Sequence, residues 1–181
     1  MTAKLVEFLG MPRVGKTHQI QLLERELKKR GYSVLVMGGH PYLFRSKSLP
    51  AEIIADKLVF FANVLEEFYQ NKEELDFIII DRGFYDSLVW FDVEALFHHI
   101  SVRCAKELKK TFAKFSKKVD KLVCLMLKAP VRKDTSSKYL DILQKSYKNN
   151  RKLFKNAIFI TKQESPARIH KRILNFVVSG S

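Results

Sequence analysis

The chain has 181 residues, a formal net charge of +14 and 46% hydrophobic residues. This length predicts one domain, spanning 1–181, with a single core. The composition is typical of a globular protein, and no apolar run approaches the roughly 18 residues that a membrane span requires. A signal-peptide pattern is also absent, so we expect a cytoplasmic protein without a membrane partner.

The basic excess is concentrated in two stretches, 106–118 and 133–155, where lysines alternate with core-type residues. We interpret them as a solvated basic face that attracts small polyphosphates. Because no DNA- or RNA-recognition module is legible, we do not expect nucleic acid as a partner, although the surface is basic. Cys104 and Cys124 lack metal-ligand spacing, which predicts reduced, structural thiols.

The first elements predict a phosphate-binding loop between a strand and a helix. The apolar run 5–9 has strand length, and 18–30 carries apolar residues at helical spacing. Between them, Gly10–Thr17 matches the pattern G-x-x-x-x-G-K-[ST]. In this motif the backbone N–H groups cradle phosphates, the lysine reaches the β- and γ-phosphates, and the serine or threonine hydroxyl binds Mg²⁺. The residues assigned to ATP are Gly10, Pro12, Arg13, Val14, Gly15, Lys16, Thr17 and His18, and Thr17 is also assigned to Mg²⁺.

The rest of the chain alternates between predicted strands and helices. Asp81 closes an apolar strand, as does the second Mg²⁺-site carboxylate of phosphate-loop proteins, and should face the loop. The pattern predicts an α/β protein with a parallel sheet, helices on both faces, and ligands at the carboxyl ends of the strands. The expected strands are 33–37, 77–81, 122–127 and 157–161; the expected helices are 50–74, 86–99, 102–119, 139–153 and one opening at Ser165-Pro166.

The predicted helix 50–74 carries an apolar stripe at helical spacing. Its members are Ile54, Leu58, Phe61, Leu65 and Phe68, which we expect to face the core. Phe60 falls on a different azimuth from this stripe.

The whole chain resembles the thymidylate kinases, within the P-loop group of nucleoside monophosphate and deoxynucleoside kinases. The resemblance lies in the loop with Arg13 between its glycines, in 58–63, in Pro41, and in Asp81-Arg82 followed by Ser87. It implies the P-loop NTPase fold, a five-stranded parallel sheet in the order 2-3-1-4-5. A homodimer is compatible with it.

The resemblance also implies roles for individual residues. Arg13 would stabilise transition-state charge, Phe60 would stack on a nucleobase beside Asn63, and Arg82 would hold the acceptor phosphate. Asp81 would position Mg²⁺ through water, and Arg132 or Lys133 would act from a short lid at 130–137. Two alternatives stay open: Phe60 as core packing, and Arg82 as an ion-pair partner of a helix carboxylate.

The chain departs from the family where base and sugar are recognised. Pro12 replaces an acidic residue, Val64 and Gly39 replace arginines, and Gly83 replaces a tyrosine. His40 stands where the related deoxynucleoside kinases carry a catalytic glutamate, which makes it a candidate substrate-binding residue.

These patterns predict ATP-dependent phosphoryl transfer to a small acceptor, most simply a nucleoside monophosphate. Two alternatives remain: a P-loop ATP-binding protein without kinase activity, and a nucleoside kinase.

Overall fold

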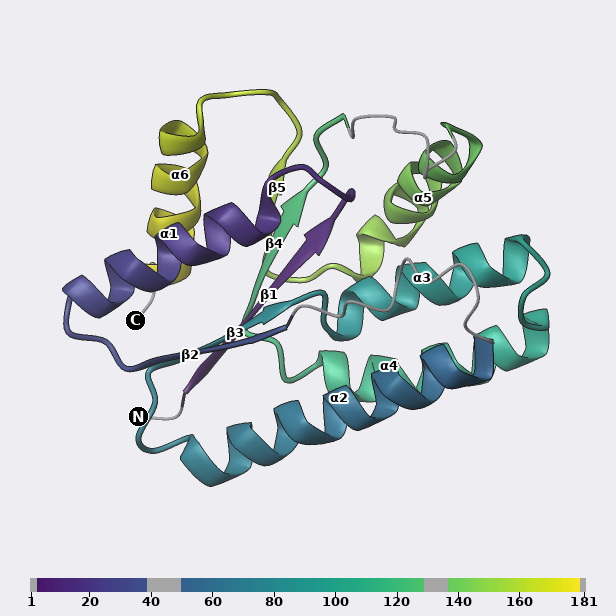
Figure 1. Cartoon of the computed structure of the whole chain (residues 1–181), viewed down its shortest axis with the longest axis horizontal. Coiled ribbons are helices and arrows are strands. Elements are labelled where there is room, and N and C mark those ends of the chain that lie inside the picture. Colours follow the sequence, from purple (N-terminus) through teal and green to yellow (C-terminus); the bar gives the residue numbers. More distant parts are fainter. Residues whose placement is uncertain (1–2, 39–49, 129–136, 180–181) are drawn as a thin grey trace.

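A computed structural model describes residues 3–38, 50–128 and 137–179 of the chain. Strands and helices alternate along it (Figure 1). The strands are β1 (Lys4–Gly10), β2 (Val34–Gly38), β3 (Phe77–Asp81), β4 (Lys121–Leu125) and β5 (Ala157–Ile160). The helices are α1 (Lys16–Lys29), α2 (Pro50–Asn71), α3 (Phe84–Leu96), α4 (Val102–Ser116), α5 (Ser137–Asn150), the 3₁₀ turn η2 (Arg151–Leu153) and α6 (Pro166–Val178).

Within the described residues the strands form one five-stranded parallel sheet in the order β2-β3-β1-β4-β5. This confirms the predicted fold class and strand order. Successive side chains of a strand point to opposite faces of the sheet, so alternate residues of each strand pack against different helices. Leu5, Leu9 and Ile78 pack toward α2–α5, whereas Val6 and Phe8 pack toward α1 and α6. Figure 1 shows these two helical layers on opposite sides of the sheet.

The ends of the helices follow local signals. Ser101 and Ser165 accept hydrogen bonds from the backbone N–H groups of Cys104 and Arg168, which caps α4 and α6. The basic residues Lys28 and Lys29 lie in the last turn of α1, where the helix dipole favours positive charge. None of the helices in residues 3–38, 50–128 and 137–179 has the length and apolar character needed to cross a bilayer.

Several expectations from the sequence were wrong in detail. Three helices have other bounds than predicted: α3, α4 and α5 span Phe84–Leu96, Val102–Ser116 and Ser137–Asn150 instead of 86–99, 102–119 and 139–153. Leu58 was placed in the core stripe of α2 but is 46% exposed, and Lys57 takes an inward position with 1% exposure. The helix ends at Asn71 rather than at 74, because Asn71 O accepts the backbone N–H groups of Glu74 and Leu75 in a turn. Cys104 is exposed rather than packed, while Cys124 is buried as expected.

Candidate functional site

The predicted phosphate loop lies at the carboxyl end of β1 and leads directly into α1. Gly10 has φ of 129° and faces β4, where a Cβ atom would lie 2.1 Å from the carbonyl oxygen of Leu125. Only glycine fits there. Arg13 also has a positive φ, of 60°, a conformation that costs a non-glycine residue about 1–2 kcal/mol. With no acidic residue in its first turn, α1 presents its N-terminus to this loop and could hold an anion.

Lys16 is folded back against the loop. Its ammonium donates to the carbonyl oxygens of Met11 at 2.6 Å and Gly10 at 3.2 Å, and the side chain is buried. Burial, together with the nearby positive charge of Arg82, lowers the pKa of Lys16 to about 7, although Asp86 and Asp81 act in the opposite direction. A phosphate group at the loop would offer this ammonium the negative charge that it lacks here.

Thr17, in the first turn of α1, meets Asp81 at the end of β3. The hydroxyl of Thr17 donates to Oδ2 of Asp81 at 3.2 Å. The other carboxylate oxygen, Oδ1, is buried without a hydrogen-bond partner in the described part of the chain. Burial raises the pKa of Asp81, against the opposing effect of Lys16 and Arg82. A hydroxyl and an orphaned carboxylate oxygen are the hard oxygen ligands that Mg²⁺ takes, so these two residues could hold that ion.

Arg82 follows Asp81 and is oriented by Asp86, four residues later. Its guanidinium lies 3.5 Å from the buried carboxylate of Asp86, and its backbone has φ of 66°. Burial opposes charge on Arg82 and is the largest single effect, but Asp86, Tyr147 and Asp81 together outweigh it and raise the pKa of the guanidinium. Burial likewise opposes charge on Asp86, yet Arg82, Lys57 and the Tyr147 hydroxyl hold the pKa of Asp86 below its ordinary value. The ion-pair alternative for Arg82 therefore has a defined partner.

Glu7 lies behind this pair, in the middle of β1. Its carboxylate is fully buried and accepts the backbone N–H groups of Asp86 at 2.9 Å and Tyr85 at 3.1 Å, at the start of α3. Burial raises the pKa of Glu7 to about 8, although these N–H groups favour the charged form. A Cβ atom at position 83 would come within 2.8 Å of this carboxyl group, so Gly83 leaves the space that Glu7 fills.

Two more buried polar side chains reach the same region from α5 and α2. The hydroxyl of Tyr147 contacts both Asp86 and the backbone of Gly10. The ammonium of Lys57 donates to the Ser87 hydroxyl at 3.1 Å and lies 5.0 Å from the centre of the Trp90 ring. Burial lowers the pKa of Lys57 to about 8, while Asp86 acts to raise it.

The structure brings together only part of the predicted site. Pro12 is buried and lines a small cavity with Arg82 and Asp86, Val14 packs against both core layers, and His18 is exposed at the start of α1. Phe60 is half-buried against the core and contacts Phe61 edge-on, which matches the packing alternative. Asn63 is exposed on α2. The remaining predicted residues lie outside the described part of the chain: Gly39, His40, Pro41, Arg132 and Lys133.

Sequence reasoning missed four members of this cluster: Glu7, Lys57, Asp86 and Tyr147. Glu7 had a signal, because a single carboxylate inside an otherwise apolar strand must be paired or neutralised when buried. Asp86 had one too, since it stands four residues after Arg82. Within the described residues no three His, Cys, Asp or Glu side chains gather as a metal site, and His99 pairs with Glu94 at 2.7 Å.

Comparison with protein-family models and with curated proteins finds no match. Solved structures do match. Thymidylate kinase from Candida albicans aligns over 97% of this chain and 91% of its own, at 16% identity and a TM-score of 0.65. Thymidylate kinase from Ehrlichia chaffeensis aligns over 98% and 99%, at 14% identity and a TM-score of 0.61. Deoxyadenosine kinase from M. mycoides, solved with bound dATP, aligns over 99% and 100%, at 15% identity and a TM-score of 0.63.

The chain has the P-loop kinase fold. At these identities the likeness establishes the arrangement of the chain alone. The fold is similar to those of thymidylate and deoxynucleoside kinases, and the comparison does not distinguish between these two classes of kinase. This agrees with the fold that the sequence resemblance implied.

Proposed function

We propose that the protein transfers the γ-phosphoryl group of ATP to a small phosphorylated acceptor, most simply a nucleoside monophosphate. One observation carries the proposal. The buried, orphaned Oδ1 of Asp81 lies on the carboxylate that Thr17 also contacts, at the start of the helix that carries Lys16. A fold that buries an unsatisfied carboxylate oxygen at this edge loses stability unless a ligand completes the site.

The loop supplies the binding of the triphosphate. Lys16 would exchange the carbonyl oxygens of Gly10 and Met11 for phosphate oxygens, and the backbone N–H groups at the start of α1 would complete the cradle. Thr17 and Asp81 would hold Mg²⁺, which, when bound, neutralises charge on the phosphate oxygens. Arg13, held by the loop in a left-handed conformation, would add positive charge as the phosphoryl group moves.

The charges beside the loop favour an anionic acceptor. Arg82 and Lys57 both lie beside the buried carboxylate of Asp86, although Asp81 also acts on Arg82, and Glu7 and Glu94 act on Lys57. An acceptor phosphate would place its negative charge next to these two cations. A phosphate oxygen is already ionised, so this reaction needs alignment and charge neutralisation but no general base.

The described carboxylates also argue against a hydroxyl acceptor, which does need a base. Both oxygens of Glu7 accept backbone N–H groups, and both oxygens of Asp86 are engaged, by Tyr147 and Arg82. Of the three carboxylates Glu7, Asp81 and Asp86, Asp81 retains a buried oxygen without a hydrogen-bond partner in the described residues, and His40 is a further candidate. The nucleoside kinase alternative, which the likeness to deoxyadenosine kinase keeps open, therefore depends on these two residues.

The second alternative is an ATP-binding protein without kinase activity. The absence of an arginine at position 64 concerns base recognition rather than phosphoryl transfer, and Val64 is fully buried in the core. A base-reading residue would have to come from another position.

Transfer from radiolabelled ATP to a panel of nucleoside monophosphates, nucleosides and water tests the proposal, with Lys16→Ala as the control for contaminating kinases. We expect labelled diphosphate products that require the wild-type loop. Labelled nucleoside monophosphates would identify a nucleoside kinase. Release of phosphate regardless of the acceptor would identify an ATP-binding protein without kinase activity.

A further inference from the structure

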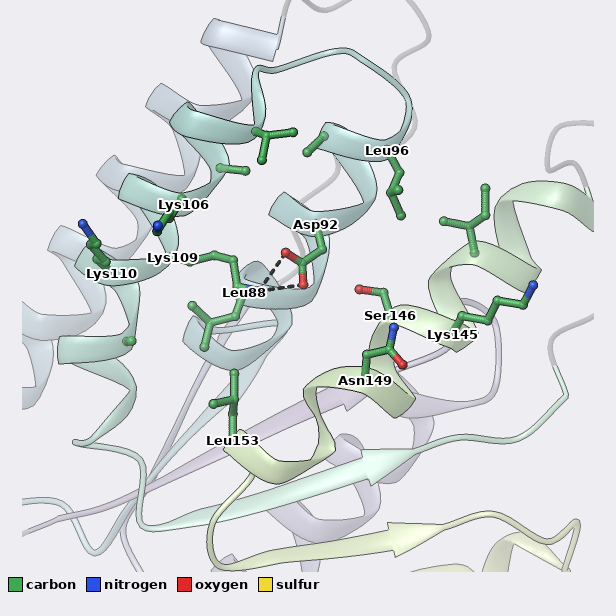
Figure 2. Close-up of a pocket in the computed structure, with 15 residues that line it drawn as sticks. Leu88, Asp92, Leu96, Lys106, Lys109, Lys110, Lys145, Ser146, Asn149 and Leu153 are labelled. Atoms are coloured by element: carbon green, nitrogen blue, oxygen red, sulfur yellow. Dashed lines mark hydrogen bonds and ion pairs between the residues drawn. The ribbon is translucent and has the colours of Figure 1, made fainter.

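A long groove lies on the helical face of the molecule, between α3, α4 and α5 (Figure 2). Its volume is about 810 Å³, and its floor is apolar, formed by side chains such as Leu88, Ala105 and Ile142. The lining of α4 runs from Val102 to Ala113, which corresponds to roughly 16 Å at the rise of an α-helix. The groove is therefore as long as about three turns of a bound helix.

Large apolar side chains at the edges of this groove are open to solvent. Val102 is 75% exposed, Leu96 62% and Leu153 46%. Single exposed apolar residues are ordinary, but three around one groove add to the apolar surface of its floor, and large exposed apolar surfaces mark interaction sites.

The groove is also positively charged. Four lysines line it, Lys106, Lys109, Lys110 and Lys145, against one aspartate, Asp92, which leaves a net charge of +3 (4 − 1). Lys109 forms an ion pair with Asp92 at 2.6 Å. Figure 2 shows this pair between α3 and α4, with Lys145 on α5, across the groove from α4. Lys106 and Lys145 are exposed, and neither forms an ion pair within the described residues.

We propose that this groove binds an acidic amphipathic helix of a partner protein. Such a helix would lay its apolar face on the floor, with anchors at i, i+3 or i+4, and i+7, and would set its carboxylates against Lys106 and Lys145. An open groove with cationic walls matches a helix that has both features, and complementary charge fixes its orientation.

Other occupants match less well. The internal stretches of this chain outside the described residues are themselves basic: 39–49 contains Arg45 and Lys47 and no acidic residue, and 129–136 contains Arg132 and Lys133 against Asp134. A second copy related by a two-fold axis would bring the same lysines of both copies together. Like charges placed opposite each other oppose that contact.

The groove is distinct from the phosphate loop but shares α5 with it. Ser146 lines the groove and donates to the carbonyl oxygen of Val89, whereas the next residue, Tyr147, contacts Gly10 of the loop. Occupation of the groove and phosphoryl transfer are separate properties, so either can be tested without the other.

The test measures fluorescence anisotropy of a labelled peptide of about 14 residues, with leucines on one helical face and glutamates on the other. One control peptide has the same composition in scrambled order, and a second has lysines in place of the glutamates. The protein is compared with Lys106→Glu/Lys145→Glu and with Lys114→Glu/Lys148→Glu, which changes exposed lysines on the same two helices outside the groove.

We expect saturable binding of the acidic peptide to the wild type and to the Lys114→Glu/Lys148→Glu control. Binding to the Lys106→Glu/Lys145→Glu variant should be about tenfold weaker, and this variant should gain affinity for the lysine peptide. Leu153→Ser should weaken binding, whereas Leu58→Ser should not, although both leucines are 46% exposed. Circular dichroism checks that each variant remains folded.

Four results would overturn the proposal. In the peptide assay, these are equal affinity for the scrambled peptide and an equal loss of affinity in both lysine-pair variants. The third is tighter saturable binding of the fatty acid anion laurate than of the peptide. The fourth is self-association of the protein in sedimentation velocity that Lys106→Glu/Lys145→Glu abolishes. The last two would identify an amphipathic small anion or a second copy as the occupant.

Discussion

The hydroxyl of Tyr147 lies 2.5 Å from Oδ1 of Asp86 and also contacts the backbone of Gly10, at the start of the phosphate loop. The Tyr147 hydroxyl has one proton, which it donates to Asp86 in the shorter contact. The hydroxyl oxygen of Tyr147 in turn accepts the backbone N–H group of Gly10 at 3.3 Å. One side chain on α5 thereby connects the loop to the carboxylate that orients Arg82.

Tyr147→Phe should destabilise the fold by about 1–3 kcal/mol, because it removes the hydrogen-bond partner of the buried Oδ1 of Asp86 and of the Gly10 N–H group. It should also lower the transfer rate, since both the loop and Arg82 lose a support. Urea unfolding and steady-state kinetics measure the two effects. Tyr69→Phe, at a tyrosine that is 53% exposed, is the control and should change neither.

Lys16→Ala should remove ATP binding while leaving the fold intact, because the ammonium contacts loop carbonyls rather than the core. Isothermal titration calorimetry measures binding, and urea unfolding measures stability. Unchanged affinity for ATP would contradict the assignment of the phosphate loop.

Affinity for ATP should also fall as the pH rises above about 7, the pKa of Lys16 in the free protein. The phosphates of ATP favour the charged ammonium of Lys16. Above this pH the free lysine is mostly neutral, so Lys16 must take up a proton when ATP binds. The decrease approaches tenfold per pH unit. Calorimetry in buffers of different ionisation enthalpy would detect the proton uptake between pH 7 and 9, and a pH-independent affinity would contradict this role.

Arg13→Ala should leave ATP affinity within several-fold but lower phosphoryl transfer by about 10³ or more, the effect of an arginine that acts on the transition state. The backbone cost should not change, because alanine and arginine have a similar cost at φ of 60°. Single-turnover kinetics separates the two effects. Arg103→Ala, at an exposed arginine on α4, is the control. Equal losses in binding and rate would make Arg13 a ligand of the ground state.

Asp81→Asn and His40→Gln distinguish the kinds of acceptor. If the acceptor is a phosphate, Asp81→Asn should weaken the dependence on Mg²⁺ without a new pH profile, and His40→Gln should be mild. If the acceptor is a hydroxyl, one of the two substitutions should abolish transfer and remove the acidic limb of the rate profile. We expect the phosphate result. Loss of activity in a folded His40→Gln protein would contradict it.

Glu7→Gln should change how stability depends on pH. Burial raises the pKa of Glu7 from 4.5 to about 8, so between these values the folded protein holds a proton that the unfolded chain has released. This contribution to stability is present below pH 4.5 and declines as the pH rises to 8, by at most about 1.4 kcal/mol per unit. The stability lost in Glu7→Gln should therefore be larger at pH 5 than at pH 8 in urea unfolding. The exposed Glu73→Gln is the control, and a constant difference would show that Glu7 is charged when folded.

The sequence by itself predicted a loop with the phosphate-binding pattern, the order of strands and helices, and the presence of Asp81 at the end of β3. These features are local: a strand alternates every two residues, a helix repeats every 3.6, and the loop needs fixed residues within eight positions. The alternation of strands and helices also predicts a parallel sheet, in which the carboxyl ends of all strands lie at the same edge. The meeting of Thr17 with Asp81 could be expected for that reason.

Only the tertiary structure decided which side chains support the loop. Tyr147 and Gly10 are 137 residues apart, and no period in the sequence connects a tyrosine on α5 with a glycine after β1. The inward position of Lys57, beside an exposed Leu58, depends on how α2 is rotated against α3, which an apolar stripe fixes only to about one residue. The groove between α3, α4 and α5 likewise exists because three separate helices are packed at a particular spacing, and spacing of this kind is set by the fit of side chains across the core.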